Sequence, residues 1–173
     1  MLGNCNYYWI KKMLFLSKAI TTLFGAGYIK YAPGTIGSIL TVLIWYLISS
    51  TVGQKYFFGL FIILTVGSYY LIKKYLSVYN KKDPQEIIID EFIGISIPLL
   101  FISSYQSYFE ILLVFVSFRI FDVFKIYPVN KADMLDGPIG IILDDVIAGI
   151  YTLIILLIFQ IIIKLSLIHI SEP

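Results

Sequence analysis

The sequence predicts an all-α integral membrane protein: a compact multi-helix bundle of about four to five apolar helices, with an interfacial helix at the N-terminus. Three observations support this fold class. Hydrophobic residues make up 59% of the 173 residues and charged residues 14%, against roughly 25% charged in ordinary soluble domains. Several apolar runs approach the roughly 20 residues that a helix needs to cross a bilayer. Polar segments with turn residues separate these runs.

The length of the chain fits one domain, which we assign to residues 1–164. Residues 165–173 do not continue the helical pattern, and they resemble the adapter-derived tail of a reading frame that runs off a sequencing contig. We therefore expect this tail to be non-native, and it carries no functional prediction. Residues 1–12 are expected to be irregular and lack the features of a signal peptide.

The first half of the chain is expected to contain one interfacial helix and two crossing helices. Residues 14–24 form an apolar run interrupted by Lys18, which favours a helix along the membrane surface. A Gly/Pro-rich loop follows. Pro33 suits the first turn of the next helix, because the N–H that proline lacks would be unpaired there. The crossing helices are predicted at 36–52 and 56–72.

The second half is expected to contain three further helices separated by polar loops. The connection at 75–85 turns at Asp83-Pro84, and the loops at 103–107 and 127–138 are polar. Pro98 is expected to kink the first of the three helices. The helices are predicted at 87–102, 109–124 and 141–164.

Three acidic positions stand out because each lies within an apolar segment. They contain Asp90 and Glu91, Asp122, and Asp144 and Asp145. A charge in such a segment is costly unless it is paired, hydrated or bound to a cation. The alternative explanations are helix capping, a favourable helix dipole and an intrahelical ion pair. We predict that the three positions converge on one metal-binding site at a membrane surface.

Other residues near these carboxylates are suited to binding a phosphate group. Arg119, Asp122 and Lys125 share one face of a helix, and a guanidinium beside a metal-binding carboxylate suits a phosphate. The loop at 30–38 offers Lys30, hydroxyl groups and free N–H groups at a helix start. Its small residues could instead serve helix packing. The predicted substrate-binding residues are Lys30, Pro33, Gly34, Thr35, Gly37, Ser38, Arg119 and Lys125.

Composition excludes several other kinds of site. Cys5 is the single cysteine and His169 the single histidine, which excludes internal disulfides and zinc sites built from several cysteines. Oxygen ligands remain for any metal. The formal net charge of +2 and the lack of a basic, aromatic-interleaved patch argue against a nucleic-acid partner.

Lysines flank the predicted helices mainly on one side of the membrane. They occur at Lys30, between residues 73 and 82, and at Lys125 and Lys131, whereas the loop at 103–110 has none. The positive-inside rule therefore places the lysine-rich side in the cytoplasm. All three acidic positions fall on that side, so the predicted site faces the cytoplasm.

With these segments in order, the chain resembles the phosphatidylglycerophosphatase A family. That family is marked by Pro-Gly-Thr-x-Gly-Ser, Asp-Glu-x-x-Gly, Phe-Arg-x-x-Asp-x-x-Lys-Pro-x-Pro and Gly-x-Gly-Ile-Met-x-Asp-Asp-x-x-Ala-Gly motifs. Two departures occur here: Ile126 replaces a proline and Pro138 replaces a glycine, and neither removes a charged group. The corresponding segments are 33–38, 90–94, 118–128 and 138–149.

The resemblance implies a Mg²⁺-dependent phosphatase that converts the lipid phosphatidylglycerophosphate to phosphatidylglycerol. It implies a multi-pass protein of the bacterial inner membrane, with membrane lipids around it, and we expect no obligatory protein partner. Arg119 and Lys125 would bind phosphate. The implied metal-binding and catalytic residues are Asp90, Glu91, Asp122, Asp144 and Asp145.

Two other functions compete with this one. A CDP-alcohol phosphotransferase also pairs acidic metal ligands with membrane helices, but its Asp-Gly-x-x-Ala-Arg motif fails at residues 136–140. A small ion- or proton-conducting membrane protein would also contain intramembrane carboxylates. That function predicts carboxylates at several depths in the bilayer, whereas those here are expected on one face.

Overall fold

The computed structural model describes residues 2–80, 84–102 and 107–171, with side chains from residue 12 to 166. Within these residues the chain forms α-helices and one 3₁₀ helix and contains no strand, so the all-α fold class is confirmed. The elements are α1 (Leu2–Thr21), η1 (Ala26–Tyr28), α2 (Pro33–Thr51), α3 (Gln54–Tyr79), α4 (Ile89–Leu99), α5 (Tyr108–Phe124), α6 (Val129–Asp133) and α7 (Pro138–Ser171).

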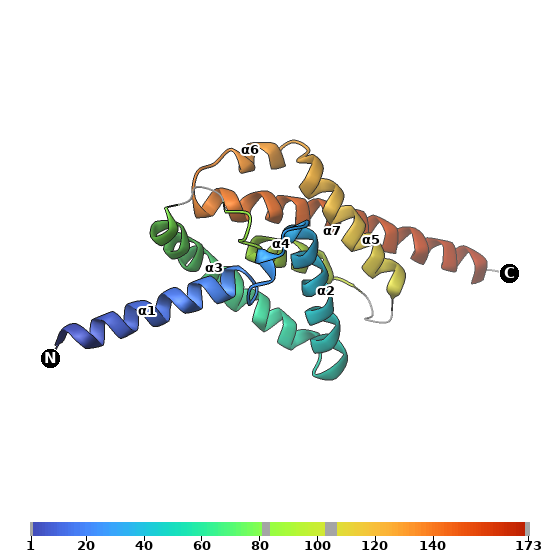
Figure 1. The fold of residues 1–173 in the computed structure, drawn as a ribbon. Coiled ribbons are helices and arrows are strands. Elements are labelled where there is room, and N and C mark those ends of the chain that lie inside the picture. The colour runs from blue at the N-terminus through green and yellow to red at the C-terminus, as the bar shows by residue number, and fades with distance from the viewer. Residues whose placement is uncertain (1, 81–83, 103–106, 172–173) are drawn as a thin grey trace.

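Helix α4 lies at the centre of the bundle, where α2, α3, α5 and α7 pack around it (Figure 1). Its apolar side chains are almost fully buried; Phe92, Ile93, Ile95 and Leu99 are at most 1% exposed. The helix has 11 residues, too few to cross a bilayer. It ends one residue after Pro98 instead of continuing past a kink, so the apolar run at 87–102 forms a short core helix.

Two glycines allow α4 and α7 to approach closely. A Cβ atom on Gly94 would lie 2.5 Å from the carbonyl oxygen of Asp145, and one on Gly149 would lie 2.2 Å from the carbonyl oxygen of Gly94. Any side chain at either position would collide with backbone. The close approach brings the first turn of α4, with Asp90 and Glu91, beside the second turn of α7, with Asp144 and Asp145.

In the part of the chain that the structure describes, three helices are long and apolar enough to cross a membrane: α2, α3 and Pro138–Ser166 of α7. Their outward surfaces carry large apolar side chains such as Leu47, Ile63 and Ile161, which are 60%, 70% and 58% exposed. An apolar surface of this extent is typical of contact with lipid. The protein is therefore associated with a membrane.

Helices α1 and α3 extend beyond their predicted ends. Helix α1 begins at Leu2, so the prediction that residues 1–12 are irregular is wrong. Helix α3 continues into the predicted connection and ends at Tyr79, because packing extends it: Tyr75 is 1% exposed, and its ring lies 4.5 Å from that of Tyr79.

Two further predictions need correction. The predicted loop at 127–138 contains α6, and α7 continues to Ser171, so the expected break at 165 is wrong. No proline or glycine lies between 150 and 172 to end that helix. Most of the predicted turn at 103–107, and Asp83 of the predicted Asp83-Pro84 turn, lie outside the described residues.

Candidate active site

Segments far apart in the sequence line one polar cavity of about 500 Å³. The start of α2, the residues before α4, the end of α5, α6 and the start of α7 all contribute. The structure therefore brings the three predicted acidic positions together. Among the described residues, the charged groups that line the cavity are Lys30, Asp90, Glu91, Arg119, Asp122, Lys125, Asp133, Asp136, Asp144 and Asp145.

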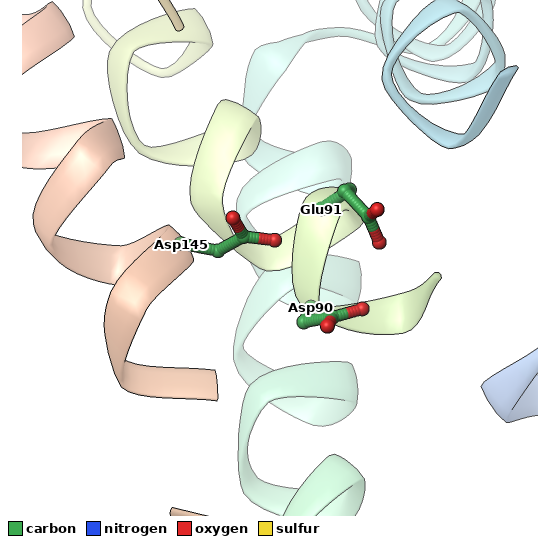
Figure 2. Close-up of side chains that lie close together, drawn as sticks. All are labelled: Asp90, Glu91 and Asp145. Atoms are coloured by element: carbon green, nitrogen blue, oxygen red, sulfur yellow. The ribbon is translucent and has the colours of Figure 1, made fainter. Parts of the chain in front are cut away.

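Three of these carboxylates form a compact group, here called the carboxylate cluster: Asp90 and Glu91 on α4, and Asp145 on α7 (Figure 2). One oxygen from each lies within 4.8 Å of the others. Oδ1 of Asp90 and Oε2 of Glu91 are buried and accept no hydrogen bond from any described residue. Buried carboxylates this close repel one another unless a cation or protons balance their charge.

The surroundings of Asp90 disfavour negative charge on its carboxylate. Removal from water, together with the charges of Glu91 and Asp145, raises the pKa of Asp90 well above its ordinary value. Protons and a metal ion would therefore compete for the same oxygens. A divalent cation offsets the charge of the carboxylate cluster more completely than one shared proton does.

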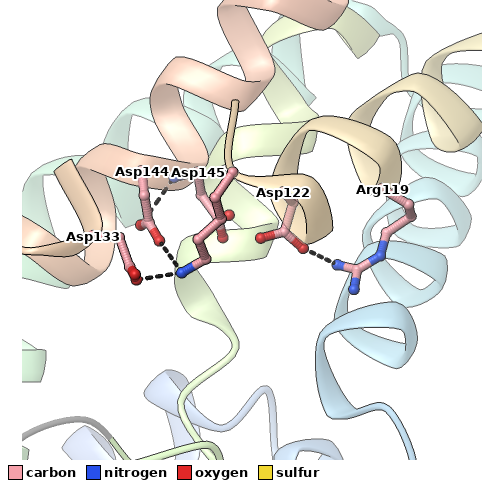
Figure 3. Close-up of polar contacts among 6 residues, drawn as sticks. Arg119, Asp122, Asp133, Asp144 and Asp145 are labelled. Carbon is pink, nitrogen blue, oxygen red and sulfur yellow. Dashed lines mark hydrogen bonds and ion pairs between the residues drawn. The ribbon is translucent and has the colours of Figure 1, made fainter. Parts of the chain in front are cut away.

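The fourth carboxylate, Asp122, pairs with Arg119 one turn earlier on α5. Arg119 Nη1 lies 2.6 Å from Oδ2 of Asp122 (Figure 3). A Cβ atom on Gly34 would lie 2.3 Å from Oε1 of Glu91 and 3.2 Å from Nη1 of Arg119. The missing side chain at Gly34 thus leaves room for the guanidinium to lie beside the carboxylate cluster.

The fifth carboxylate, Asp144, pairs with Lys125 at the end of α5. Lys125 Nζ donates to Oδ2 of Asp144 at 3.2 Å and forms a second ion pair with Asp133. Partial burial acts to lower the pKa of Lys125, but the two carboxylates outweigh it and raise the pKa above its ordinary value. Lys125 therefore stays protonated, and Asp144 pairs with it instead of belonging to the carboxylate cluster.

Asp133 is a site residue that the sequence analysis missed. It ends α6 and pairs with Lys125, as Figure 3 shows for its carboxylate. It lies in the segment predicted as a loop, where helical spacing gives no information about neighbours. The available signal was its position between the two motifs that supply Lys125 and Asp144.

The predicted loop at 30–38 contributes only in part to the cavity. Lys30, Pro33 and Gly34 line it, whereas Thr35, Gly37 and Ser38 are not among the described lining residues. The Ser38 hydroxyl donates to the Gly34 carbonyl at 3.0 Å within α2. A Cβ atom on Gly37 would lie 3.2 Å from the Ile88 side chain. Gly37 and Ser38 thus lie where α2 packs against the start of α4.

Comparison with known proteins shows which family the chain resembles. The model of the family described as phosphatidylglycerophosphatase A matches residues 19–160, which include the lining residues. The chain belongs to the phosphatidylglycerophosphatase A family. Its members include a Haemophilus influenzae phosphatidylglycerophosphatase A, 36% identical over 138 residues, 79% of this chain and 84% of that protein. The Escherichia coli phosphatidylglycerophosphatase A is 32% identical over 128 residues, 73% of each chain.

A third relative has a different name. A Bacteroides thetaiotaomicron protein, provisionally named a phosphatidylinositol-3-phosphatase, is 33% identical over 152 residues, 85% of this chain and 95% of that protein. All three names describe enzymes that remove phosphate from a lipid. No solved structure matches the chain.

Proposed function

We propose that this protein is a magnesium-dependent phosphatase that hydrolyses phosphatidylglycerophosphate to phosphatidylglycerol and inorganic phosphate. The observation that carries the proposal is the convergence of the carboxylate cluster with Arg119 and Lys125 in one cavity. Family membership and the names of the Haemophilus and Escherichia relatives support the substrate. The cavity volume of about 500 Å³ is in the range of small-ligand sites.

The carboxylate cluster suits magnesium, because this ion binds through oxygen and is usually shared between one or two carboxylates and a substrate phosphate. Asp90, Glu91 and Asp145 would hold it, and the two buried oxygens without hydrogen-bond partners are available as ligands. When bound, the ion would offset phosphate charge and activate a water molecule. Asp122 and Asp144 are further predicted ligands or bases, and both are ion-paired here.

The two cations can bind phosphate without giving up the ion pairs that position them. A guanidinium has five N–H donors, so Arg119 can keep Asp122 and still offer a forked pair to phosphate oxygens. An ammonium group has three donors. Asp133 and Asp144 use two of those on Lys125, which leaves one for the substrate.

In the proposed reaction a water oxygen forms a bond to phosphorus while the bond between phosphorus and the glycerol oxygen breaks. The water proton ends on the leaving alkoxide, so the products are phosphatidylglycerol and inorganic phosphate. Negative charge on the transferring phosphoryl oxygens faces Arg119 and Lys125. Preorganised cations at such positions stabilise the transition state.

The proposal also includes a location. The lysine distribution and the three helices that could cross a membrane support a multi-pass protein of the bacterial inner membrane, with the cavity facing the cytoplasm. Labelling of single cysteines introduced near Lys131 and near Lys55 in intact cells tests this orientation. Reaction of a membrane-impermeant reagent with the Lys131 position from outside would overturn it.

The catalytic proposal is tested by phosphate release from phosphatidylglycerophosphate in detergent, with magnesium or with a chelator. We expect the chelator, Asp90→Asn and Asp145→Asn each to reduce turnover about 10²-fold or more. Glu110→Gln is the matched control, because Glu110 is also buried and acidic but lies at the opposite end of α5. Wild-type turnover in both aspartate variants would refute the site.

Phosphatidylinositol 3-phosphate is a second candidate substrate, because the Bacteroides relative matches over 85% of this chain. Both lipids present a phosphate monoester to the same cavity. Measuring kcat/KM for the two lipids in matched micelles distinguishes them. A higher value for phosphatidylinositol 3-phosphate would replace the substrate while leaving the roles of the carboxylate cluster unchanged.

A further inference from the structure

An apolar groove of about 360 Å³ lies between α2 and α5, apart from the polar cavity. Among the described residues, those that line it are all apolar or aromatic, and none is shared with the cavity. Three come from α2 and four from α5: Ile39, Val42, Leu43, Tyr108, Ile111, Leu112 and Phe115.

The same two helices also line the polar cavity, with the start of α2 and the end of α5. The groove lies further along both helices, on the side away from the proposed phosphate site. The first turn of α2 meets the last turns of α5, since a Cβ atom on Gly34 would lie 3.2 Å from Arg119 Nη1. At 1.5 Å per residue, Leu43 lies about 14 Å along α2 from Gly34. Leu112 lies about 10 Å along α5 from Arg119.

This length corresponds to one half of a bilayer, whose hydrocarbon is about 30 Å thick. Helix α2 is a candidate membrane span, and the groove starts near the end that carries the site. A lipid with its phosphate beside Arg119 would therefore direct its chains along this groove. We propose that the groove between α2 and α5 binds one acyl chain of the substrate lipid. This inference rests on the proposed function.

The size of the groove favours a single chain over a protein helix. A helix about 10 Å in diameter would fill 360 Å³ with less than one 5.4 Å turn. A methylene chain is narrow enough to lie between the two helices. Because lipid tails are as apolar as leucine, leaving the bilayer for the groove yields little affinity. The groove therefore orients the phosphate in the cavity.

The first test fills the groove from either wall. Ile39→Trp and Leu112→Trp are compared with Ile62→Trp on α3, because Ile39 and Ile62 are 44% and 45% exposed and Ile62 does not line the groove. For phosphatidylglycerophosphate with two 18-carbon chains, we expect both groove variants to lower kcat/KM roughly tenfold. With two 4-carbon chains, all three variants should match wild type.

A loss of equal size in Ile62→Trp would overturn the proposal, and so would an equal loss for both substrates in a groove variant that unfolds at the wild-type melting temperature. Wild-type kcat/KM of both groove variants on the 18-carbon substrate would also overturn the proposal. Phosphate release by the wild-type protein would still support the proposed function. The substrate pair also separates a groove effect from misfolding, since a misfolded variant loses activity on both.

The second test does not depend on hydrolysis. A phosphatidylglycerophosphate with a photoreactive group midway along one chain is irradiated with the protein in phosphatidylcholine vesicles, and labelled residues are mapped by mass spectrometry. Labelling confined to the groove residues, and suppressed by unlabelled phosphatidylglycerophosphate, supports the proposal. The same pattern from a photoreactive phosphatidylcholine overturns it. If wild-type protein releases no phosphate, the proposed function fails and this labelling still decides the groove.

Discussion

Replacing Gly149 by alanine tests whether the close approach of α4 and α7 assembles the site. The added methyl group would lie 2.2 Å from the Gly94 carbonyl oxygen, whereas carbon–oxygen contacts of this kind are normally 3.3 Å or longer. The two helices must therefore separate by about 1 Å. Gly149 lies one turn after Asp145, so Asp145 would move away from Asp90 and Glu91 by a similar amount.

Two quantities should change in Gly149→Ala. Magnesium ligands lie at 2.0–2.1 Å in strict geometry, and a 1 Å displacement can reduce a rate about 10²-fold. We expect phosphate release to fall by about that factor, and overpacking to reduce the free energy of unfolding by about 1–3 kcal/mol. Turnover is measured in detergent over a magnesium series, and stability by thermal unfolding in the same detergent.

Gly59→Ala on α3 is the matched control, because an added Cβ there would meet no atom within 4 Å. Its activity should equal that of wild type. Wild-type turnover and magnesium dependence in Gly149→Ala would refute the reasoning, since the carboxylate cluster would then form without the glycine contact.

Three further substitutions test other parts of the site. Gly34→Ala would place a methyl group 2.3 Å from Glu91 Oε1, so we expect half-maximal phosphate release to need about tenfold more magnesium; an unchanged magnesium requirement would contradict this. Asp133→Asn removes one carboxylate from Lys125, and kcat/KM should fall about tenfold with an unchanged melting temperature, because the pair is partly exposed. Loss of stability instead would assign Asp133 a structural role. Arg119→Lys keeps the charge but loses the forked donor pair, so kcat/KM should fall about 10²-fold, and wild-type kinetics would exclude bidentate phosphate binding.

Helices α2 and α5 were predictable from the sequence because their apolar runs are bounded by recognisable signals. Pro33 starts α2 as predicted, and α5 begins and ends within one residue of its predicted bounds. The length and place of α4 were not predictable. A continuous apolar run describes a crossing helix and a buried core helix equally well, and only the surrounding helices determine which one forms.

Most of the charged residues of the candidate site were predictable, whereas Asp133 and the arrangement of the site were not. Carboxylates within apolar runs stand out on energetic grounds, so Asp90, Asp122 and Asp145 could be selected from the sequence. The ion pair of Arg119 with Asp122 is local to α5, whereas the carboxylate cluster and the pairs of Lys125 depend on contacts between different segments. The approach of Gly94 to Gly149 and the pairing of Asp133 with Lys125 are two such contacts.

The arrangement of α4 and α7 also affects biosynthesis. The carboxylates of α4 leave the ribosome well before Asp145, and among the described residues the carboxylate cluster has no member from the first half of the chain. A nascent chain therefore carries two mutually repelling acids on a short apolar helix until α7 emerges and docks. Assembly of the bundle and formation of a site able to hold a divalent ion should thus occur together, once α7 has been synthesised.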